Sequence, residues 1–137
     1  MNRLEERLAD RRPGLAPYVT AGDGGLDTTL AVLRALDRAG VTCVELGVPF
    51  SDPVADGPVL QAATARALAE GTTLDGVLSV VAGFRRGGRG AAGSDLPVAI
   101  FSYANPLLRR GWRRSCELIA AAGADALIVP DLPVEES

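Results

Sequence analysis

The sequence predicts an α/β protein in which strands and helices alternate and the strands form a parallel sheet. Two observations predict it: four apolar, β-branched stretches are bounded by glycine or proline, and the stretches between them carry apolar residues at helical spacing. Because the connecting loops are short, we expect right-handed helical crossovers between consecutive strands. The 137 residues, 47% of them hydrophobic, are enough for one domain with a core.

The first strand is expected over residues 15–22, where the run "LAPYVTAG" ends in a glycine turn. A helix is expected over residues 27–40, because leucines recur every three residues along "DTTLAVLRALDRAG". Asp27 is its expected N-cap and Gly40 its stop.

The second strand is expected over residues 41–48, "VTCVELGV". A helix follows over residues 58–71, with Pro58 in its first turn and Gly71 past its end, which is the usual asymmetry of helix termini.

Another helix is expected over residues 72–86, capped by Thr72 or Thr73. The glycine-rich stretch 87–95 is interpreted as a loop, since no strand precedes it as a phosphate cradle would require.

The third strand, the last helix and the fourth strand are expected over residues 96–105, 112–123 and 124–133. Polar residues follow the strand ends: "PFSDP" after the second, "SYAN" at the third and "PDLP" at the fourth. Such units build either a doubly wound sheet or a (β/α)8 barrel. We favour the TIM barrel, because its chemistry sits where the strands end.

A complete barrel of this kind takes about 250 residues. The chain is therefore expected to hold only the first four βα units, as a fragment, a truncated product or a half that closes by pairing. Residues 1–137 are expected to be one partial barrel domain with no second domain.

Composition excludes several classes of function. The net charge is −3, so no basic field attracts nucleic acid or an anionic membrane. All 14 basic residues are Arg, and without Lys or His there is neither Schiff-base chemistry nor a Ser-His or Cys-His nucleophile. Cys43 and Cys116 fit no metal or redox spacing, and no apolar run reaches the ~18 residues of a membrane span. We expect a soluble, cytoplasmic protein without a metal.

The first candidate functional residue is a carboxylate inside an apolar strand. Alternation places Glu45 on the same face as Gly47 and opposite Val44 and Leu46. In a barrel the branched residues face the helices, and Glu45 then points into the mouth, where a carboxyl group can donate and accept protons.

Asp56, in the turn "SDPVADGP", is the second candidate. Two carboxyl groups in contrasting environments are a common way to separate acid and base roles. The alternative is that Asp52 and Asp56 are ordinary turn residues, because Asp before Pro or Gly is common in turns.

The stretch "VELGVPFSDPVADGP" closely resembles the signature of the tryptophan synthase alpha chain family, and "PYVTAGD", "YANPLL" and "LIVPDLPVEES" extend the resemblance along nearly the whole chain. The resemblance implies a (β/α)8 barrel lyase of tryptophan biosynthesis. Its reaction is the retro-aldol cleavage of indole-3-glycerol phosphate to indole and glyceraldehyde 3-phosphate. The family uses no cofactor on this chain, and indole passes to a PLP-dependent beta chain.

The resemblance also implies residue roles. Glu45 matches the general acid/base that protonates the indole ring carbon, and Asp56 matches the carboxylate that pairs with the indole N–H. Five residues match positions that line the indole pocket, or alternatively pack the barrel core: Tyr18, Phe101, Tyr103, Ile128 and Pro130. Four more fall in loops that face the beta chain in the family, or alternatively serve turn chemistry: Asp52, Pro53, Asn105 and Pro106.

The sequence departs from the family pattern in two ways. "GDGG" stands where the family usually has "GDP", and the second half of the barrel is absent with its phosphate-binding loops. Three hypotheses follow: a lyase of the alpha-chain type, a non-catalytic remnant or interaction module that keeps the loops facing the beta chain, and another phosphate-sugar barrel enzyme. The stretch "ELGVPFSDPVADGP" argues against the third.

Overall fold

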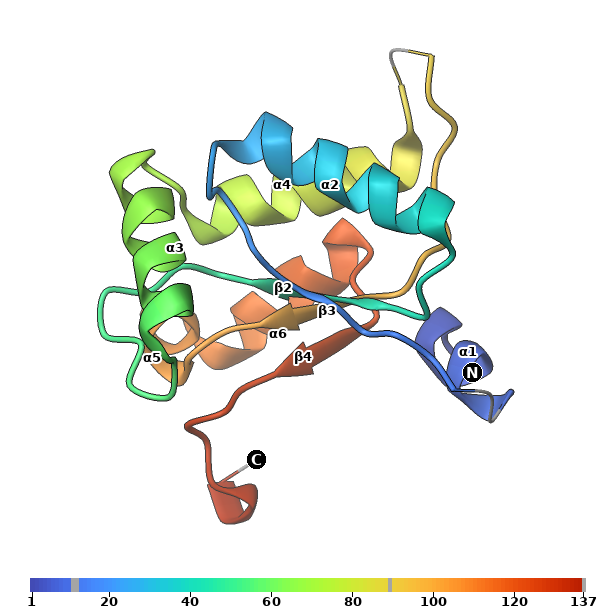
Figure 1. The fold of residues 1–137 in the computed structure, drawn as a ribbon. Helices are drawn as coiled ribbons and strands as arrows, with labels where there is room; N and C mark the ends of the chain where they lie inside the picture. The colour runs from blue at the N-terminus through green and yellow to red at the C-terminus, as the bar shows by residue number, and fades with distance from the viewer. Residues whose placement is uncertain (11–12, 89, 137) are drawn as a thin grey trace.

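The computed structural model describes residues 1–10, 13–88 and 90–136, and in these residues four parallel strands form one sheet in the order β1–β2–β3–β4. Their bounds are β1 (Tyr18–Thr20), β2 (Val44–Gly47), β3 (Val98–Phe101) and β4 (Ala126–Ile128). A doubly wound sheet reverses its strand order at a switch point, whereas a barrel adds each strand next to the one before it. The observed order is therefore that of an opened barrel segment (Figure 1).

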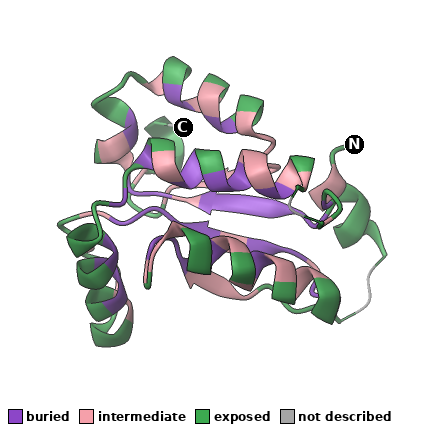
Figure 2. Cartoon of the chain, turned by 90° about the horizontal axis from the view of Figure 1, so that it is seen from above, coloured by how far each residue is buried: buried purple, intermediate pink, exposed green. Residues whose placement is uncertain are grey.

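Three long helices, α2 (Leu26–Ala39), α4 (Leu74–Arg86) and α6 (Trp112–Ala122), form one layer, because α4 packs against both α2 and α6. Figure 2 shows buried residues running along the sheet beneath these helices. The core between the two layers is made of large apolar side chains that are almost fully buried: Leu33, Val44, Leu46, Val77, Val81, Phe84, Val98 and Ile100.

The expected helix boundaries are largely confirmed. The helix α3 (Pro58–Ala69) begins at Pro58, and Gly71 beyond its end has a φ of +77°. Thr73 caps α4, since its hydroxyl accepts a hydrogen bond of 3.2 Å from the backbone N–H of Gly76. The Thr73 hydroxyl thus satisfies one of the free backbone N–H groups at the start of α4, and the positive φ of Gly71 suits the residue beyond the end of α3.

The N-cap prediction for α2 was wrong. The helix begins at Leu26 after Gly25, and Asp27 lies inside the first turn. Gly24 and Gly25 have φ values of +78° and +94°, which only glycine adopts readily, so they turn the chain into the helix earlier than a side-chain cap at Asp27 would. The Asp27 carboxylate is still well placed against the positive end of the helix dipole.

Two shorter helices were not predicted. The helix α1 (Arg3–Ala9) begins with a capping box, in which Asn2 Oδ1 accepts from the N–H of Glu5 at 2.9 Å and Glu5 accepts from the N–H of Asn2 at 2.8 Å. The helix α5 (Ala104–Leu108) occupies the end of the strand expected over residues 96–105. The strand stops earlier because Asp131 Oδ1 accepts from the N–H of Ala104 at 2.9 Å and so satisfies the start of a helix.

Beyond these elements, a short 3₁₀ helix (Val134–Glu136) follows β4. Within the glycine-rich stretch 87–95, a single bridge joins Gly88 and Ala91, while residue 89 lies outside the described part of the chain. Within the described ranges no single helix has the length and hydropathy to cross a membrane; only α3 and α4 taken together do, and they are bent by 93° at the break between them.

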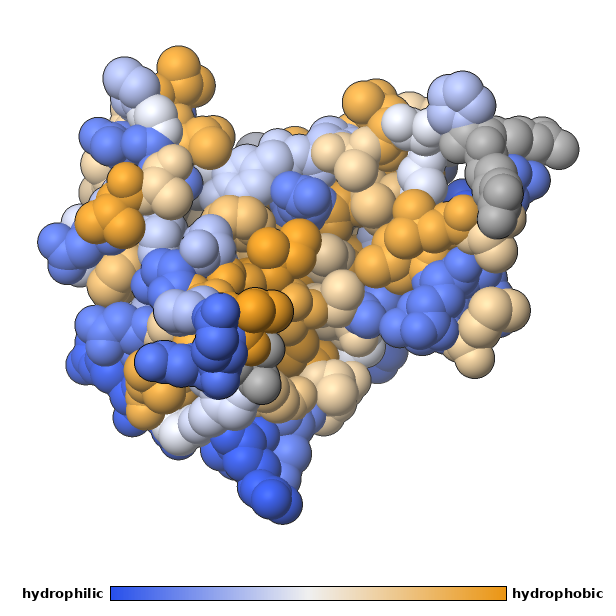
Figure 3. Space-filling view, turned by 90° about the horizontal axis from the view of Figure 1, so that it is seen from below, coloured by the Kyte–Doolittle hydropathy of each residue, from blue (hydrophilic) through white to orange (hydrophobic). Residues whose placement is uncertain are grey.

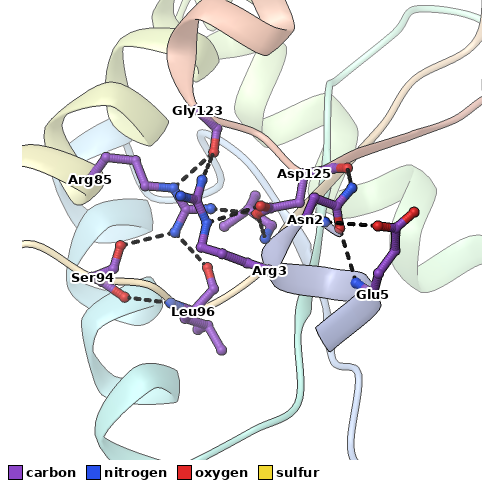
Figure 4. A network of polar contacts seen from close by, with 9 residues as sticks. Asn2, Arg3, Glu5, Arg85, Ser94, Leu96, Gly123 and Asp125 are labelled. Atoms are coloured by element: carbon purple, nitrogen blue, oxygen red, sulfur yellow. Dashed lines mark hydrogen bonds and ion pairs between the residues drawn. The ribbon is translucent and has the colours of Figure 1, made fainter. Parts of the chain in front are cut away.

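The N-terminal end of the sheet is held by an ion-pair network around Asp125 (Figure 4). The side chain of Asp125 is only 3% exposed, and its two oxygens lie 2.7 Å from Arg85 Nη2 and 3.0 Å from Arg3 Nε. The backbone N–H of Val98 donates to the same carboxylate at 2.9 Å. One buried carboxylate thus joins α1, α4 and the starts of β3 and β4.

Arg85 uses its remaining N–H groups on backbone carbonyls. It donates to Gly123 at 2.8 Å, to Ser94 at 3.0 Å and to Leu96 at 2.6 Å. Burial lowers the pKa of the Arg85 guanidinium and the charge of Asp125 opposes that change, but an arginine stays protonated in proteins. This planar donor is therefore well matched to the three carbonyls and the carboxylate around it.

Candidate functional site

Glu45 lies on the open face of the sheet, as alternation predicts. Val44 and Leu46 beside it are fully buried against the helix layer, while Glu45 is only partly buried. In the parallel register Glu45 is level with Tyr18 on β1 and with Ala99 on β3. The carboxylate therefore projects from the face of the sheet that no helix covers.

The next level of the same face is set by Thr20, Gly47, Phe101 and Ile128, which are register partners across the four strands. Ile128 and Phe101 are half-buried and lie side by side, as expected for residues that line a barrel interior. Figure 3 shows hydrophobic surface gathered in a hollow on the side of the molecule away from α2 and α4.

The side chain of Tyr18 packs against this level of the open face, beside Gly47 and Phe101. Its ring contacts Phe101 edge to face, with centroids 5.5 Å apart and planes at 89°. A Cβ atom at position 47 would collide with the Tyr18 hydroxyl, so only glycine leaves room for the phenol there. Gly47 thus lets Tyr18 reach across β2 toward the carboxylates.

Asp56 lies in the loop between β2 and α3 and is held by Tyr103. The Tyr103 hydroxyl donates to Asp56 Oδ1 at 3.1 Å and accepts from the backbone N–H of Ala55 at 3.0 Å. The ring of Tyr103 packs beside that of Phe50, with centroids 5.7 Å apart. This contact joins the ends of β2 and β3 at the carboxyl edge of the sheet.

Burial and nearby carboxylates raise the pKa values of the two phenols, Tyr18 and Tyr103. Burial raises the pKa of the Tyr18 phenol, the negative charge of Asp56 raises it further, and Tyr103 and Glu45 add smaller contributions. Burial likewise raises the pKa of Tyr103, and its bond to Asp56 adds to the change. Both phenols therefore stay protonated at neutral pH, and both carboxylates act on the same phenol, Tyr18.

The other predicted positions lie at the same end of the molecule. Pro130 is exposed, two residues beyond β4. Asp52 is exposed and accepts from the Ser51 hydroxyl at 3.2 Å, and Pro53 beside it is half-buried. Asn105 and Pro106 both belong to α5; the first is exposed and the second half-buried.

A cavity of about 640 Å³ does not coincide with the predicted mouth. It lies between the β2–α3 loop, the start of α4 and α5, and its lining includes Phe50, Leu74, Pro106 and Arg109 but neither Glu45 nor Asp56. The face with the carboxylates is an open surface, because the sheet has four strands where a closed barrel has eight.

No metal centre was expected, and the described residues contain no group of His, Cys, Asp and Glu side chains that could hold a metal ion. What this arrangement offers chemically is proton transfer by two carboxylates beside an aromatic-lined surface. Fold and site together define the class: a segment of a (β/α) barrel with one carboxylate on the open face of β2 and a second in the loop that follows β2.

Comparison with known proteins gives the family. A family model described as tryptophan synthase alpha chain matches residues 4–137. The tryptophan synthase alpha chain of Synechococcus elongatus is 52% identical over 126 residues, which cover 92% of this chain and 45% of the relative. That of Coxiella burnetii is 48% identical over 137 residues, covering all of this chain and 50% of the relative. The chain belongs to the tryptophan synthase alpha chain family.

Solved structures agree. The tryptophan synthase subunit alpha of Legionella pneumophila matches with a TM-score of 0.90 at 40% identity, over 99% of this chain and 52% of that one. A chain of the Pyrococcus furiosus tryptophan synthase complex matches with a TM-score of 0.82 at 41% identity, over 90% of this chain and 48% of that one. The fold is that of part of a TIM barrel, and the chain spans about half the length of the relatives it matches.

Proposed function

We propose that these residues supply the acid/base half of a tryptophan synthase alpha-type lyase, which cleaves indole-3-glycerol phosphate to indole and glyceraldehyde 3-phosphate. The observation that carries the proposal is that Glu45 lies level with Tyr18 on the uncovered face of the sheet, while Tyr103 holds Asp56 in the loop that follows β2. Membership of the family supports the substrate.

In this mechanism Glu45 donates a proton to the indole ring carbon at the scissile bond. The bond to the side chain then breaks, its electrons return to the ring system, and the neighbouring hydroxyl loses its proton as it becomes the aldehyde of the second product. Asp56 pairs with the ring N–H and stabilises the positive charge that develops there. Glu45, now ionised, takes up the released proton, so that the carboxyl serves as acid and then as base.

The chain needs no cofactor of its own for these steps. A beta chain that carries PLP is the proposed partner and the acceptor of indole, in an assembly of two alpha and two beta chains. The surface positions Asp52, Pro53, Asn105 and Pro106 at the carboxyl end of the barrel support such a contact, as does the structure of the Pyrococcus furiosus tryptophan synthase complex. A cytoplasmic location stays a prediction.

The second candidate is an interaction module without turnover. It is favoured by one observation, that the chain spans about half of its relatives. Barrels of this kind bind phosphate with the loops after strands seven and eight, and the described residues supply four strands.

The test uses a full-length alpha chain that carries residues 1–137 as its first half, incubated with indole-3-glycerol phosphate with and without the beta chain. We expect indole and glyceraldehyde 3-phosphate in equal amounts. Binding of the beta chain without any indole above the uncatalysed background would instead favour the interaction module.

A further inference from the structure

Tyr103 is fixed more firmly than a residue that only lines a pocket. It lies two residues beyond β3, stands at the N-cap position of α5 and is only 3% exposed. Its ring lies beside Phe50 at 5.7 Å between centroids. With so little surface left for a ligand, its main contacts are with the protein itself.

The Tyr103 hydroxyl has one role as donor and one as acceptor, and both are used on the same loop. It accepts from the N–H of Ala55 at 3.0 Å and donates to Asp56 Oδ1 at 3.1 Å. The first bond fixes the hydroxyl relative to the loop backbone. The second takes up one of the two carboxylate oxygens and so sets the direction of the other.

We propose that Tyr103 is a positioning residue for the lyase reaction, which orients the Asp56 carboxylate so that its second oxygen meets the ring N–H of the substrate. This inference rests on the proposed function of Asp56. A carboxylate on a partly solvated loop has several rotamers, and a hydrogen bond to a packed phenol selects one of them before the substrate binds.

The protonation state of Tyr103 supports the donor role. Burial raises the pKa of the phenol, and the bond to Asp56 and the charge of Asp131 raise it as well. Because the pKa of the phenol is raised above its ordinary value near 10, the O–H stays protonated at neutral pH. The phenol therefore remains a donor at any pH where the enzyme is expected to work.

The first experiment is a double-mutant cycle in the full-length chain. Tyr103→Phe keeps the ring and its packing on Phe50 but removes the hydroxyl. We expect kcat to fall about 10- to 100-fold with little change in KM, because a misplaced catalytic group can cost ~10²-fold. In an Asp56→Asn background the same change should have almost no further effect.

Two results of the cycle would overturn the proposal. One is an unchanged kcat in Tyr103→Phe. The other is an equal loss in both backgrounds, because a merely structural role for the hydroxyl does not depend on the Asp56 carboxylate.

The second experiment does not depend on enzymatic activity, and it does not require the Tyr103→Phe variant to fold. The chain has two tyrosines, so in a Tyr18→Phe background Tyr103 is the one phenol of residues 1–137. With a second half that carries no tyrosine, or has it replaced by Phe, absorbance titration then reports Tyr103 alone. Asp56→Asn should lower the midpoint toward its ordinary value, whereas Asp52→Asn, an equal loss of charge in the same loop, should leave it unchanged.

If the titration midpoint of Tyr103 were unchanged in Asp56→Asn, or shifted equally in the two variants, the hydrogen bond between Tyr103 and Asp56 would be refuted. The proposal would then fail. If the parent chain released no indole, the proposed function would fail, but the titration would still show whether Tyr103 is bonded to Asp56. If the parent were active and the losses in Tyr103→Phe and Asp56→Asn were additive, only the positioning role of Tyr103 would be refuted.

Discussion

The two ends of the sheet use polar side chains in opposite ways. At the N-terminal end, the side chain of Asp125 is almost fully buried and pairs with Arg85 and Arg3, and both Asp125 and Arg85 also bond to backbone groups. Toward the carboxyl end, the Tyr103 bond engages one oxygen of Asp56 in the β2–α3 loop, and Glu45, the second residue of β2, stands partly exposed on the open face of the sheet. The first arrangement joins elements of the fold, whereas the second leaves carboxylate oxygens to meet a ligand.

This difference agrees with the division of labour in barrels, where the N-terminal face serves stability and the carboxyl face serves chemistry. Changes at the first end should therefore lower the free energy of unfolding, and changes at the second should lower turnover.

The largest effect is expected from isolating the 137-residue chain. Its half-buried Tyr18, Phe101 and Ile128 then have no second half of a barrel opposite them, and β1 and β4 are unpaired edges. At ~25 cal/mol per Å² of apolar surface left in water, the loss is a few kcal/mol, comparable with the ~5–15 kcal/mol stability of a whole domain. We expect self-association in light scattering and no indole in a coupled assay.

A stable monomer with a cooperative melt would refute the structural part of this prediction. Indole release above the uncatalysed background would refute the catalytic part, because it would show that binding of the substrate phosphate by a second half is dispensable.

The next largest effect should come from Asp125→Asn in the full-length chain. Removing one partner of a buried ion pair leaves Arg85 uncompensated, which typically costs about 3–5 kcal/mol. Urea unfolding should show this loss, while kcat at a temperature where the variant is folded should match the parent. Asp95→Asn, an exposed carboxylate near the same network, is the control and should change stability by less than ~0.5 kcal/mol. Equal stability of the two variants would mean that the network is not structural.

Asp56→Asn should lower kcat, but less than a change at Glu45, because Asp56 lies on a loop that is more open to water. Asparagine keeps a hydrogen-bond acceptor for Tyr103 and loses the negative charge that stabilises the ring N–H. Steady-state kinetics test this expectation. If both kcat and KM equalled those of the parent, Asp56 would be a turn residue only.

The smallest effect is expected at the exposed ion pair between Asp23 and Arg66, which joins the β1–α2 loop to α3 at 2.7 and 2.8 Å. The hydrogen bond from Arg66 lowers the pKa of Asp23, so the pair stabilises the fold above the unfolded value of about 3.9 and is lost as the pH falls through the lower folded value. Asp23→Asn should shift the urea midpoint slightly at pH 7 and not at pH 2. A shift of equal size at both would exclude the ion pair as its cause.

Structural features that depend on residues close together in the sequence could be predicted. Two-residue alternation placed Glu45 opposite Val44 and Leu46, and glycine, proline and threonine marked the ends of α3 and α4. The expected strands were too long, because three or four residues in each make the ladder and the flanking residues turn toward loops or, at Ala104, into a helix.

Contacts between distant residues could not be predicted in this way. Tyr103 and Asp56 are 47 positions apart, and Arg85 and Asp125 are 40 apart. No local spacing encodes such a pair, since it depends on which strands become neighbours and in what register. Family resemblance predicted site roles for Tyr103 and Asp56, but their mutual hydrogen bond could be seen only in the structure.

The most direct test of the account is to measure kcat and the urea midpoint of Glu45→Gln on the same preparation of the full-length chain. The variant keeps the size and hydrogen-bonding groups of the side chain and loses its ionisable proton. We predict that indole release falls by about 10²–10⁴-fold or more while the unfolding midpoint stays close to that of the parent. Turnover near the parent rate in the folded variant would contradict the acid/base role of Glu45, and with it the claim that the carboxyl end of this sheet carries the chemistry.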